Sequence, residues 1–549
     1  MDIVLVGLPG SGKSVVGKRL AHRHGAAFID LDERIEHEDG RSIPRIFDED
    51  GEAAFRTLER RAVADLGPAD PDPELKRIVA SGGGAVVDPR NRWSLYRGRL
   101  SVWLDSRPEV LAQRLRRSPH IRPLVSGRDP IGTLRDLARR RERFYAAADV
   151  HVTGVADVSE VLATVERHLA EGMTTGAPTT LMRATTPIGW VLLGDGIAAA
   201  AIDETLRRLE ARRAILVSEP GAWAAVGDGL LGELVAAGWT VATVMLPQGE
   251  SAKRLSVLED AASELARLRV ERDEPIIAIG GGALGDAAGF LAATYLRGIP
   301  VVHVPTTLVA QIDSSIGGKT AVDLPEGKNL VGAFHQPVAI VIDIGVLATL
   351  PERHRRAALA EAVKMAALGD ERLFELLERH GDDIARGEPE AVERGDLAEL
   401  VERCAWAKVE VVLADERERG PRGGRITLNL GHSLGHAVEA AAGYADLLHG
   451  EAVAYGLRAA CEIGVTAEVT PPERAARITR LLDALGLARE PLRYGLDDVL
   501  GHLAADKKHS GGRLRWVLPT AEGVEIRPDI SDELVAAAAA SMLAARSAP

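Results

Sequence analysis

The sequence lacks the hallmarks of secreted, membrane-spanning and nucleic-acid-binding proteins. Its 549 residues include two cysteines, Cys404 and Cys461, so a disulfide framework is not supported and a reducing cytoplasm fits. No run of about 18 apolar residues occurs, so we expect no transmembrane helix. The apolar start, residues 3–6, lacks the basic segment and cleavage site of a signal peptide. The net charge of −13 contrasts with the basic patch that nucleic-acid-binding proteins normally carry. We therefore expect a cytoplasmic protein that acts on small molecules, without a nucleic-acid or membrane partner.

The chain is too long for one hydrophobic core, and about three domains of ordinary size fit its length. Residues 1–172 alternate short apolar runs with amphipathic segments, which predicts an α/β domain with a parallel sheet. Residues 173–186 are rich in Thr, Gly and Ala without any period, and we predict a linker there. Residues 187–350 again alternate strand and helix patterns, and residues 351–549 are rich in Ala, Leu, Glu and Arg. The first of these segments predicts a Rossmann-like α/β nucleotide-binding domain, and the second predicts a mostly α-helical domain.

Short apolar runs mark the expected buried strands, and two early segments have the period of an amphipathic helix. The predicted strands are Ile3–Val6, Ile78–Ala80, Leu100–Leu104, Ala214–Ser218, Val241–Leu246, Ile276–Ile279, Val301–Val304 and Val338–Ile342, and the predicted helices are Ser14–His24 and Val110–Arg117.

A phosphate-binding loop is the first chemical signal. Residues 7–14 read GLPGSGKS, which matches G-x-x-x-x-G-K-S directly after an apolar strand. In such a loop the backbone N–H groups surround phosphate oxygens. Lys13 is placed to contact the β- and γ-phosphates, and Ser14 to ligate Mg²⁺. The loop predicts a nucleotide site but does not identify the group that accepts the phosphate.

Further motifs in the first 170 residues help to identify the molecule that accepts the phosphate. They are F-I-D-L-D at 28–32, D-G-E-A-A-F-R at 50–56, G-G-G-A at 82–85, R-P-L at 122–124 and R-E-R-F-Y at 141–145. Taken singly, D-x-D is also typical of a solvated turn, and an arginine-rich loop is also typical of an ordinary surface. Together and in this order they resemble shikimate kinase over essentially all of residues 1–170.

The resemblance implies a P-loop kinase fold and ATP-dependent 3-phosphorylation of shikimate. It implies that Ser14 and Asp30 hold Mg²⁺, that Asp32 polarises the attacking hydroxyl, and that Arg122 closes over the transferred phosphoryl group. The implied ATP-binding residues are Gly10, Ser11, Gly12, Lys13, Ser14, Val15 and Arg122, and the implied shikimate-binding residues are Asp32, Arg56, Gly82, Gly83 and Arg141. The lid sequence 119–121 departs from the family pattern, so no adenine contacts are assigned.

A glycine turn and a polar segment mark a second site. Residues 276–286 read IIAIGGGALGD, a buried strand that runs into glycines and then small residues, as at a helix N-terminus near a pyrophosphate. The pattern is not a standard G-x-G-x-x-G, and alone it equally fits a packing turn. Residues 305–321, PTTLVAQIDSSIGGKTA, concentrate hydroxyls, a carboxylate, a glycine pair and a lysine. So many polar groups between apolar strands indicate a binding site.

Candidate metal ligands lie in the last third of the chain. Glu361 lies in a helical segment, His432 and His436 have the i, i+4 spacing of one helix face, and His449 follows. A histidine pair at this spacing is, by itself, more often ordinary surface or core. Two histidines and one carboxylate with an open position suit catalytic Zn²⁺.

Over roughly residues 185–545 the sequence resembles 3-dehydroquinate synthase. The shared motifs include G-G-G-A-L-G-D, P-T-T-L-x-A-Q-x-D-S-S-x-G-G-K-T-A, G-K-N-L, A-E-x-x-K, L-N-x-G-H-x-x-G-H-A-x-E, H-G-E-A-V-A and D-K-K. The resemblance implies conversion of 3-deoxy-arabino-heptulosonate 7-phosphate into 3-dehydroquinate and phosphate. NAD⁺ would oxidise a ring hydroxyl transiently, phosphate would leave, and reduction, ring opening and an aldol closure would follow. The resemblance also implies a homodimer through this part of the chain.

The same resemblance assigns site residues. It implies Zn²⁺, or Co²⁺, held by Glu361, His432 and His449, with His436 as a substrate or proton-relay group. The implied NAD-binding residues are Glu250, Lys253, Gly281, Gly282, Asp286, Thr306, Thr307, Lys319, Lys328 and Thr349. The implied substrate-binding residues are Arg297, Asp313, Asn329 and Lys507, and the implied catalytic ones are Lys319, Lys364, Lys408, Arg425, Asn429 and His436. Segment 418–425 is longer than in the family, so Glu418 has no assigned role.

Two alternatives stay open at this point. The same folds could act on another small molecule, as a different kinase or a different sugar-phosphate cyclase. One half could also be a non-catalytic scaffold, although Lys13, Asp32 and the metal ligands, which decay would remove first, are present. The two implied reactions are not consecutive, so we predict no direct channelling between the sites.

Overall fold

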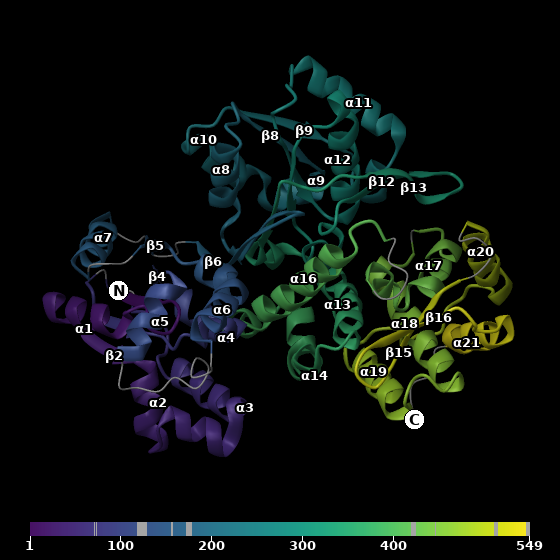
Figure 1. Cartoon of the computed structure of the whole chain (residues 1–549). Helices are drawn as coiled ribbons and strands as arrows, with labels where there is room; N and C mark the ends of the chain where they lie inside the picture. The colour runs from purple at the N-terminus through teal and green to yellow at the C-terminus, as the bar shows by residue number, and fades with distance from the viewer. Residues whose placement is uncertain are drawn as a thin grey trace. The chain divides into compact units, whose positions relative to one another are not determined.

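The computed structural model describes residues 1–70, 72, 74–117, 129–154, 158–171, 178–418, 424–444, 446–509 and 514–544 (Figure 1). The chain divides into two compact units. One comprises residues 1–186, 190–201 and 341–345, and the other comprises residues 187–189, 202–340 and 346–549.

The first elements alternate strand and helix. From the N-terminus to residue 195 they are β1 (Asp2–Val6), α1 (Lys13–His24), β2 (Ala27–Asp30), α2 (Leu31–Asp39), α3 (Ile43–Ala64), β3 (Arg77–Ala80), η1 (Ala85–Val87), α4 (Pro89–Tyr96), β4 (Leu100–Asp105), α5 (Pro108–Arg117), α6 (Pro130–Tyr145), β5 (Val150–Thr153), α7 (Val158–Glu171), β6 (Thr179–Thr186) and β7 (Gly189–Asp195).

The parallel sheet of the first unit has the strand order β2-β3-β1-β4-β5. Its central strand β1 is buried along its whole length, as expected for a parallel strand covered on both faces. Val4 and Val6 belong to one core, and Ile3 and Leu5 belong to another on the opposite face. The phosphate-binding loop therefore begins at the carboxyl end of the most buried strand, which fixes its position.

The linker prediction for residues 173–186 is wrong in part. Residues 172–177 lie outside the described residues, but Thr179–Thr186 forms strand β6, which lies in the order β6-β7-β14. Leu181, Met182 and Ala184 are buried in it. Threonine is β-branched and favours strands, so a Thr-rich segment without a long apolar run can still pair in a sheet. The other domain boundaries stay predictions.

The next elements also alternate. They are α8 (Ala198–Arg208), β8 (Ala214–Ser218), α9 (Pro220–Ala222), η3 (Trp223–Gly227), α10 (Asp228–Ala236), β9 (Val241–Met245), η4 (Gly249–Ala252), α11 (Leu255–Arg267), β10 (Ile276–Gly280), α12 (Gly282–Thr294), η5 (Tyr295–Arg297), β11 (Val301–Pro305), η6 (Ala310–Ser314), β12 (Lys319–Leu324), β13 (Gly327–Phe334), β14 (Ala339–Asp343) and η7 (Ile344–Thr349). Strands β14, β11, β10, β8 and β9 pair in this order and in parallel. Strands β12 and β13 form an antiparallel hairpin.

The rest of the chain is mostly helical, as predicted. Its elements are α13 (Glu352–Ala367), α14 (Glu371–Arg386), α15 (Pro389–Glu393), α16 (Asp396–Ala414), η8 (Arg425–Asn429), α17 (His432–Ala441), α18 (His449–Thr466), α19 (Pro472–Ala484), α20 (Leu496–His509), β15 (Trp516–Pro519), β16 (Val524–Arg527) and α21 (Asp532–Ala544). The antiparallel hairpin β15–β16 was not predicted, and β15 packs against α18 (Figure 1). In the part of the chain that the structure describes, no helix is both long enough and apolar enough to cross a bilayer.

Two glycines allow three helices to meet closely. A Cβ atom on Gly456 of α18 would lie 1.8 Å from the carbonyl oxygen of Gly431, which caps α17. A Cβ atom on Gly450 of α18 would lie 2.0 Å from the carbonyl oxygen of Ala357 on α13. Any larger residue would push these helices apart. The small residues thus bring α13, α17 and α18 together, and these helices carry the candidate metal ligands.

Candidate active sites

The P-loop of the first unit has the expected strand-loop-helix geometry. Gly10 and Gly12 have φ values of 84° and 99°, which only glycine adopts without strain, and Gly12 caps the N-terminus of α1. The Lys13 ammonium is buried and donates hydrogen bonds to the carbonyl oxygens of Gly7 at 2.8 Å and Leu8 at 3.1 Å. Of the other predicted ATP-binding residues, Ser11 is buried and Val15 is half exposed.

The predicted magnesium pair lies together. The Ser14 hydroxyl donates a hydrogen bond of 2.6 Å to Oδ2 of Asp30, at the carboxyl end of β2. The other oxygen, Oδ1, accepts from the backbone N–H groups of Asp32 and Glu33 and so caps helix α2. One carboxylate therefore fixes the start of α2 and faces the P-loop serine. A hydroxyl and a carboxylate oxygen fit Mg²⁺, which prefers oxygen ligands.

Glycines 82–84 allow neighbouring residues to approach the backbone closely. A Cβ on Gly83 would lie 2.8 Å from Pro9 of the P-loop, and one on Gly82 would lie 2.8 Å from Oδ1 of Asp32. A Cβ on Gly84 would lie 2.5 Å from the guanidinium of Arg56. Three predicted shikimate-binding positions, Gly82, Asp32 and Arg56, therefore meet at this segment.

The second predicted arginine reaches the same segment. Nη1 of Arg141 donates a hydrogen bond of 2.7 Å to the carbonyl oxygen of Gly83, and the Tyr145 hydroxyl donates to the same oxygen. The predicted lid residue Arg122 lies outside the described residues.

Sequence reasoning missed Glu59 at this site. Its carboxylate is buried and lies 2.8 Å from Nη1 of Arg56, and the carboxylate of Glu52 lies 2.8 Å from Nη2 of the same side chain. Burial raises the pKa of Glu59, although the charge of Arg56 opposes the shift. The spacing of three residues from Arg56, which puts both on one helix face, was the available signal.

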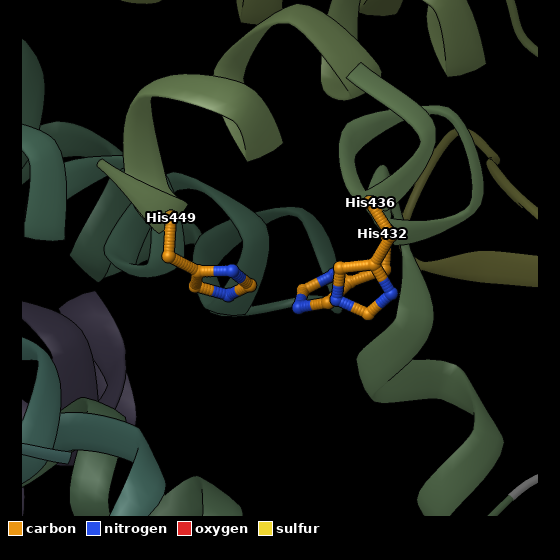
Figure 2. A group of neighbouring side chains, drawn as sticks. All are labelled: His432, His436 and His449. Carbon is orange, nitrogen blue, oxygen red and sulfur yellow. The ribbon is translucent and has the colours of Figure 1, made fainter. Parts of the chain in front are cut away.

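The candidate metal ligands of the second unit converge. Nε2 of His449 lies 3.1 Å from Oε1 of Glu361, and Nε2 of His432 lies 3.3 Å from the same oxygen. Figure 2 shows the rings of His432, His436 and His449 turned toward a common region, and one nitrogen from each can be chosen so that all three lie within 4.8 Å of one another. His432 and His449 are thus shared by two triads, one completed by Glu361 and one by His436. Imidazole nitrogens and a carboxylate oxygen are donors that suit Zn²⁺ or Co²⁺.

The charge states of this cluster follow from its contacts. Burial opposes ionisation of Glu361, but Lys364, whose ammonium lies 2.5 Å from Oε2, and His432 hold its pKa well below the usual range. Burial also opposes a charged His449, but hydrogen bonds to Glu361 and Glu439 raise its pKa to about 10. Burial lowers the pKa of His436 to about 3.

Asp313 links two predicted catalytic lysines. The Lys408 ammonium contacts Oδ1 of Asp313 and donates to its carbonyl oxygen at 2.7 Å, and the Lys364 ammonium lies 3.7 Å from Oδ2. Burial lowers the pKa of Lys408, although Asp313 opposes the shift. Two cations are thus held at the site by one carboxylate.

Glu418, which the sequence left unassigned, joins two predicted residues. Its Oε2 lies 2.5 Å from the Lys319 ammonium, and its Oε1 accepts a hydrogen bond of 3.4 Å from Nδ2 of Asn429. Arg425 donates to the carbonyl oxygens of Gly317 at 2.8 Å and Glu416 at 3.0 Å. These predicted residues therefore lie together at the end of α16.

A pocket of about 620 Å³ joins the metal cluster to the glycine turn. The predicted site residues that line it are Glu250, Lys253, Gly282, Asp286, Asp313, Lys328, Asn329, His436 and His449. The Lys253 ammonium is buried, lies 2.9 Å from Oδ2 of Asp286 and also contacts Oδ1 of Asn329. Asn329 lies on the hairpin strand β13 with a φ of 58°, and its side chain contacts Lys253. The predicted dinucleotide-binding residues thus come from separate loops into one pocket.

Glu219 was missed at the dinucleotide site. Its Oε2 accepts from the backbone N–H of Gly249 at 2.6 Å, and its Oε1 accepts from that of Gly281 at 3.3 Å. It therefore ties the loop of Glu250 to the glycine turn. Its place directly after the buried strand β8 was the available signal.

The other predicted NAD- and substrate-binding residues that the structure describes do not line this pocket. The N–H of Thr306 donates to Gly280, and the hydroxyl of Thr307 accepts from Ala310. Thr349 is exposed and donates to the carbonyl oxygen of Val346. The side chain of Lys507 lies outside the described residues.

Arg297 does not line this pocket, and its predicted contact with the substrate stays a prediction. Arg297 is exposed and follows the carboxyl end of α12, whereas the pocket lies at the N-terminus of this helix. A helix of 13 residues is about 20 Å long, so the two ends are far apart. Sequence order alone did not reveal that distance.

Comparisons with known proteins agree with this geometry. Residues 9–170 match the family model for shikimate kinase, residues 243–357 match that for the 3-dehydroquinate synthase N-terminal domain, and residues 358–509 match that for its C-terminal domain. The 3-dehydroquinate synthase of Symbiobacterium thermophilum is 43% identical over 350 residues, which cover 63% of this chain and 95% of that protein. The chain belongs to the 3-dehydroquinate synthase family. A shikimate kinase domain precedes the synthase, as predicted.

A second sequence relative and a solved structure are also similar to the synthase part of the chain. The 3-dehydroquinate synthase of a Synechococcus strain is 44% identical over 323 residues, covering 59% of this chain and 85% of that protein. The solved structure of the 2-epi-5-epi-valiolone synthase of Streptomyces hygroscopicus, with NAD⁺ and Zn²⁺ bound, is 30% identical, with a TM-score of 0.59, covering 64% of this chain and 96% of that one. That neighbour carries the two cofactors expected from the sequence of this synthase.

Proposed function

We propose that the chain is a bifunctional enzyme of aromatic amino-acid biosynthesis. The kinase domain phosphorylates shikimate with ATP, and the synthase converts 3-deoxy-arabino-heptulosonate 7-phosphate into 3-dehydroquinate and phosphate. The observation that carries the proposal is the convergence of Glu361, His432 and His449 from three helices beside the pocket of Lys253 and Asp286. These groups fit a metal and a dinucleotide within one site.

In the synthase, charged side chains position an anionic substrate. When bound, NAD⁺ supplies a hydride acceptor and the metal polarises a hydroxyl or carbonyl group. Asp313 lines the pocket and holds Lys364 and Lys408, so two ammonium groups are ready to contact phosphate or carboxylate oxygens. Lys319 forms an ion pair with Glu418, and Asn429 donates a hydrogen bond to it, so Glu418 orients both side chains. We propose that these cations bind the phosphorylated acid, although the net charge of the protein is −13.

In the kinase, positioning and charge neutralisation carry the reaction. Ser14 and Asp30 supply oxygen ligands for Mg²⁺, and Lys13 adds a positive charge inside the P-loop. Arg56 and Arg141 bear planar guanidinium groups that can clamp the substrate carboxylate in two parallel hydrogen bonds. Asp32 next to Gly82 accepts the proton of the attacking hydroxyl.

Two substitutions in the full chain separate the activities. With heptulosonate phosphate, NAD⁺ and Zn²⁺ the enzyme should release phosphate, and with shikimate and MgATP it should form ADP. Lys13→Ala should abolish ADP formation and leave phosphate release unchanged. His449→Ala should abolish phosphate release and leave ADP formation unchanged. A chain that forms neither product, or a substitution that removes both activities, would overturn the proposal.

A different sugar-phosphate cyclase is the second candidate, because the solved neighbour is a valiolone synthase. The two are distinguished by substrate. A 3-dehydroquinate synthase should require the C1 carboxylate of its substrate, whereas a heptulose phosphate without a carboxylate should be turned over only by the alternative. Comparing kcat/KM for the two sugars decides between them.

The homodimer and the cytoplasmic location belong to the same proposal. The family resemblance supports a dimer through the synthase, and the two free, buried cysteines fit a reducing compartment. Light scattering of the full chain should give twice 58.5 kDa. A mass of 58.5 kDa at micromolar concentration would contradict the dimer.

A further inference from the structure

Glu439 lies beside the metal cluster but has no role in the reaction described above. It follows His432 by seven residues and His436 by three, so all three share one face of α17. Its side chain is 7% exposed. A buried carboxylate needs compensating partners, and Glu439 has two of them on different sides.

The first partner is the metal-site histidine His449. Oε2 of Glu439 lies 3.2 Å from Nδ1 of His449, and Nε2 of the same ring faces Glu361 at 3.1 Å. The ring is therefore held at both nitrogens. In metal sites, a carboxylate on the outer nitrogen of a ligating histidine fixes its tautomer and orientation and makes it a better ligand. Glu439 is placed to do this for His449.

The second partner lies on the dinucleotide side of the pocket. Oε1 of Glu439 lies 2.8 Å from the ammonium of Lys328, on the hairpin strand β13. The same ammonium lies 3.2 Å from Oε1 of Glu250 and 4.4 Å from the centre of the Tyr444 ring. The backbone N–H of Tyr444 in turn donates to the carbonyl oxygen of Glu439 at 3.0 Å. Lys328 is thus positioned mainly by residues of the Glu439 segment.

The hairpin connects this contact to the rest of the dinucleotide pocket. Asn329, the next residue, contacts Lys253, and its N–H donates to Asp323 at 2.8 Å. Adjacent residues of β13 therefore reach in two directions, Lys328 to the helix of the metal cluster and Asn329 to the nucleotide-binding loops. An unbroken series of contacts runs from His449 through Glu439 and Lys328 to Glu250.

We propose that Glu439 is a positioning residue that serves both cofactors of the synthase at once, orienting His449 for the metal and holding Lys328 for the dinucleotide. The inference rests on the proposed function of the synthase part. It differs from a merely structural ion pair in its consequences. A structural pair would alter thermal stability, whereas a shared positioning residue alters two binding constants in a defined pattern.

The test compares Glu439→Gln, Lys328→Met and the double variant in the full chain. Zinc affinity is measured by competition with a chromogenic chelator, and NAD⁺ affinity by calorimetry on the metal-free protein. A Gln side chain can still accept from His449 through its amide oxygen, but its NH₂ group then faces the Lys328 ammonium. Glu375→Gln is the matched control, because Glu375 pairs only with Arg379 in an exposed i, i+4 ion pair among the described contacts.

Glu439→Gln should weaken zinc binding about tenfold, because the outer carboxylate of His449 is lost. It should also weaken NAD⁺ binding about tenfold, as expected for loss of a charge-assisted contact. Lys328→Met should weaken NAD⁺ binding to the same extent and leave zinc affinity within about twofold. The double variant should lose no more NAD⁺ affinity than Lys328→Met alone, because Glu439 acts on NAD⁺ through Lys328.

Unchanged zinc affinity in Glu439→Gln, or losses of NAD⁺ affinity that multiply in the double variant, would overturn the inference while leaving the proposed function intact. Failure of the unsubstituted protein to bind either cofactor would overturn both. If Glu439→Gln does not fold, Glu439→Asp replaces it, because the shorter side chain keeps the charge but withdraws it from both partners. The same two losses are then expected.

Discussion

Gly456 of α18 lies against the carbonyl oxygen of Gly431, so closely that a Cβ at position 456 would be 1.8 Å from that oxygen. Gly431 precedes His432, and α18 begins at His449. The contact therefore sets the distance between the two helices that supply the histidines. The small size of Gly456 is therefore needed both for helix packing and for the spacing of the histidines.

Gly456→Ala should separate α17 from α18. The added methyl group should destabilise the synthase by about 1–3 kcal/mol, as other overpacked sites do, and should weaken zinc binding. Shikimate-dependent ADP formation should persist. Denaturant unfolding and a chelator titration measure the two effects.

The matched control is Gly232→Ala on α10, where an added Cβ meets nothing within 4 Å. It should be neutral or stabilising by about 0.5–1 kcal/mol, because alanine favours a helix interior. Wild-type zinc affinity in Gly456→Ala would contradict the role given to this contact.

Asp30→Asn should separate the two roles of Asp30. An asparagine still caps α2, so the stability of the kinase should change little, whereas Asp30→Ala should cost about 1 kcal/mol. Both variants lose the charge that faces Ser14, so the Mg²⁺ concentration for half-maximal ADP formation should rise about tenfold. Synthase activity serves as the internal control. An unchanged Mg²⁺ requirement in both variants would exclude Asp30 from the metal site.

Glu59→Gln should impair shikimate binding more than turnover. Gln can still accept from Arg56, but it no longer balances the charge of that guanidinium, so the KM for shikimate should rise while kcat falls less. A loss confined to kcat would contradict a positioning role for Glu59.

The same variant should change how stability depends on pH. Burial raises the pKa of Glu59, so its contribution to stability is fully present below the unfolded pKa of about 4.3 and is lost as pH rises through the folded value. Glu59→Gln lacks this loss. Its stability relative to the wild type should therefore increase as pH rises above about 4.3, which urea unfolding at a series of pH values can measure. The opposite slope would show that the ion pair with Arg56 outweighs burial.

Much of the fold was predictable from the sequence, because continuous apolar runs and a period-3.6 pattern determine buried strands and covering helices. Strands β1, β3, β8 and β10 all occur where they were expected. Strand β6 and the hairpin β15–β16 were missed, because β6 is rich in threonine and β15 is only four residues long. Their pairing depends on partners elsewhere in the chain.

The candidate sites were predictable where a residue belongs to a motif with its own spacing. Lys13, Asp30 and His432 were found in this way. Glu59, Glu219 and Glu439 were not, because each is a carboxylate that acts on another side chain or on backbone N–H groups, and only the folded structure shows those contacts. Arg297 lies at the other end of α12 from the pocket, and its role in substrate binding stays a prediction.

The central claim is that Glu361, His432 and His449, brought together from three helices, hold one catalytic metal ion. Metal analysis of the purified full chain and of Glu361→Ala, together with phosphate release from the heptulosonate phosphate, tests it most directly. The account predicts one zinc or cobalt ion per chain in the wild type, and loss of both the metal and phosphate release in the variant, with shikimate phosphorylation retained. Full metal content in Glu361→Ala, or phosphate release from metal-free protein, would contradict it.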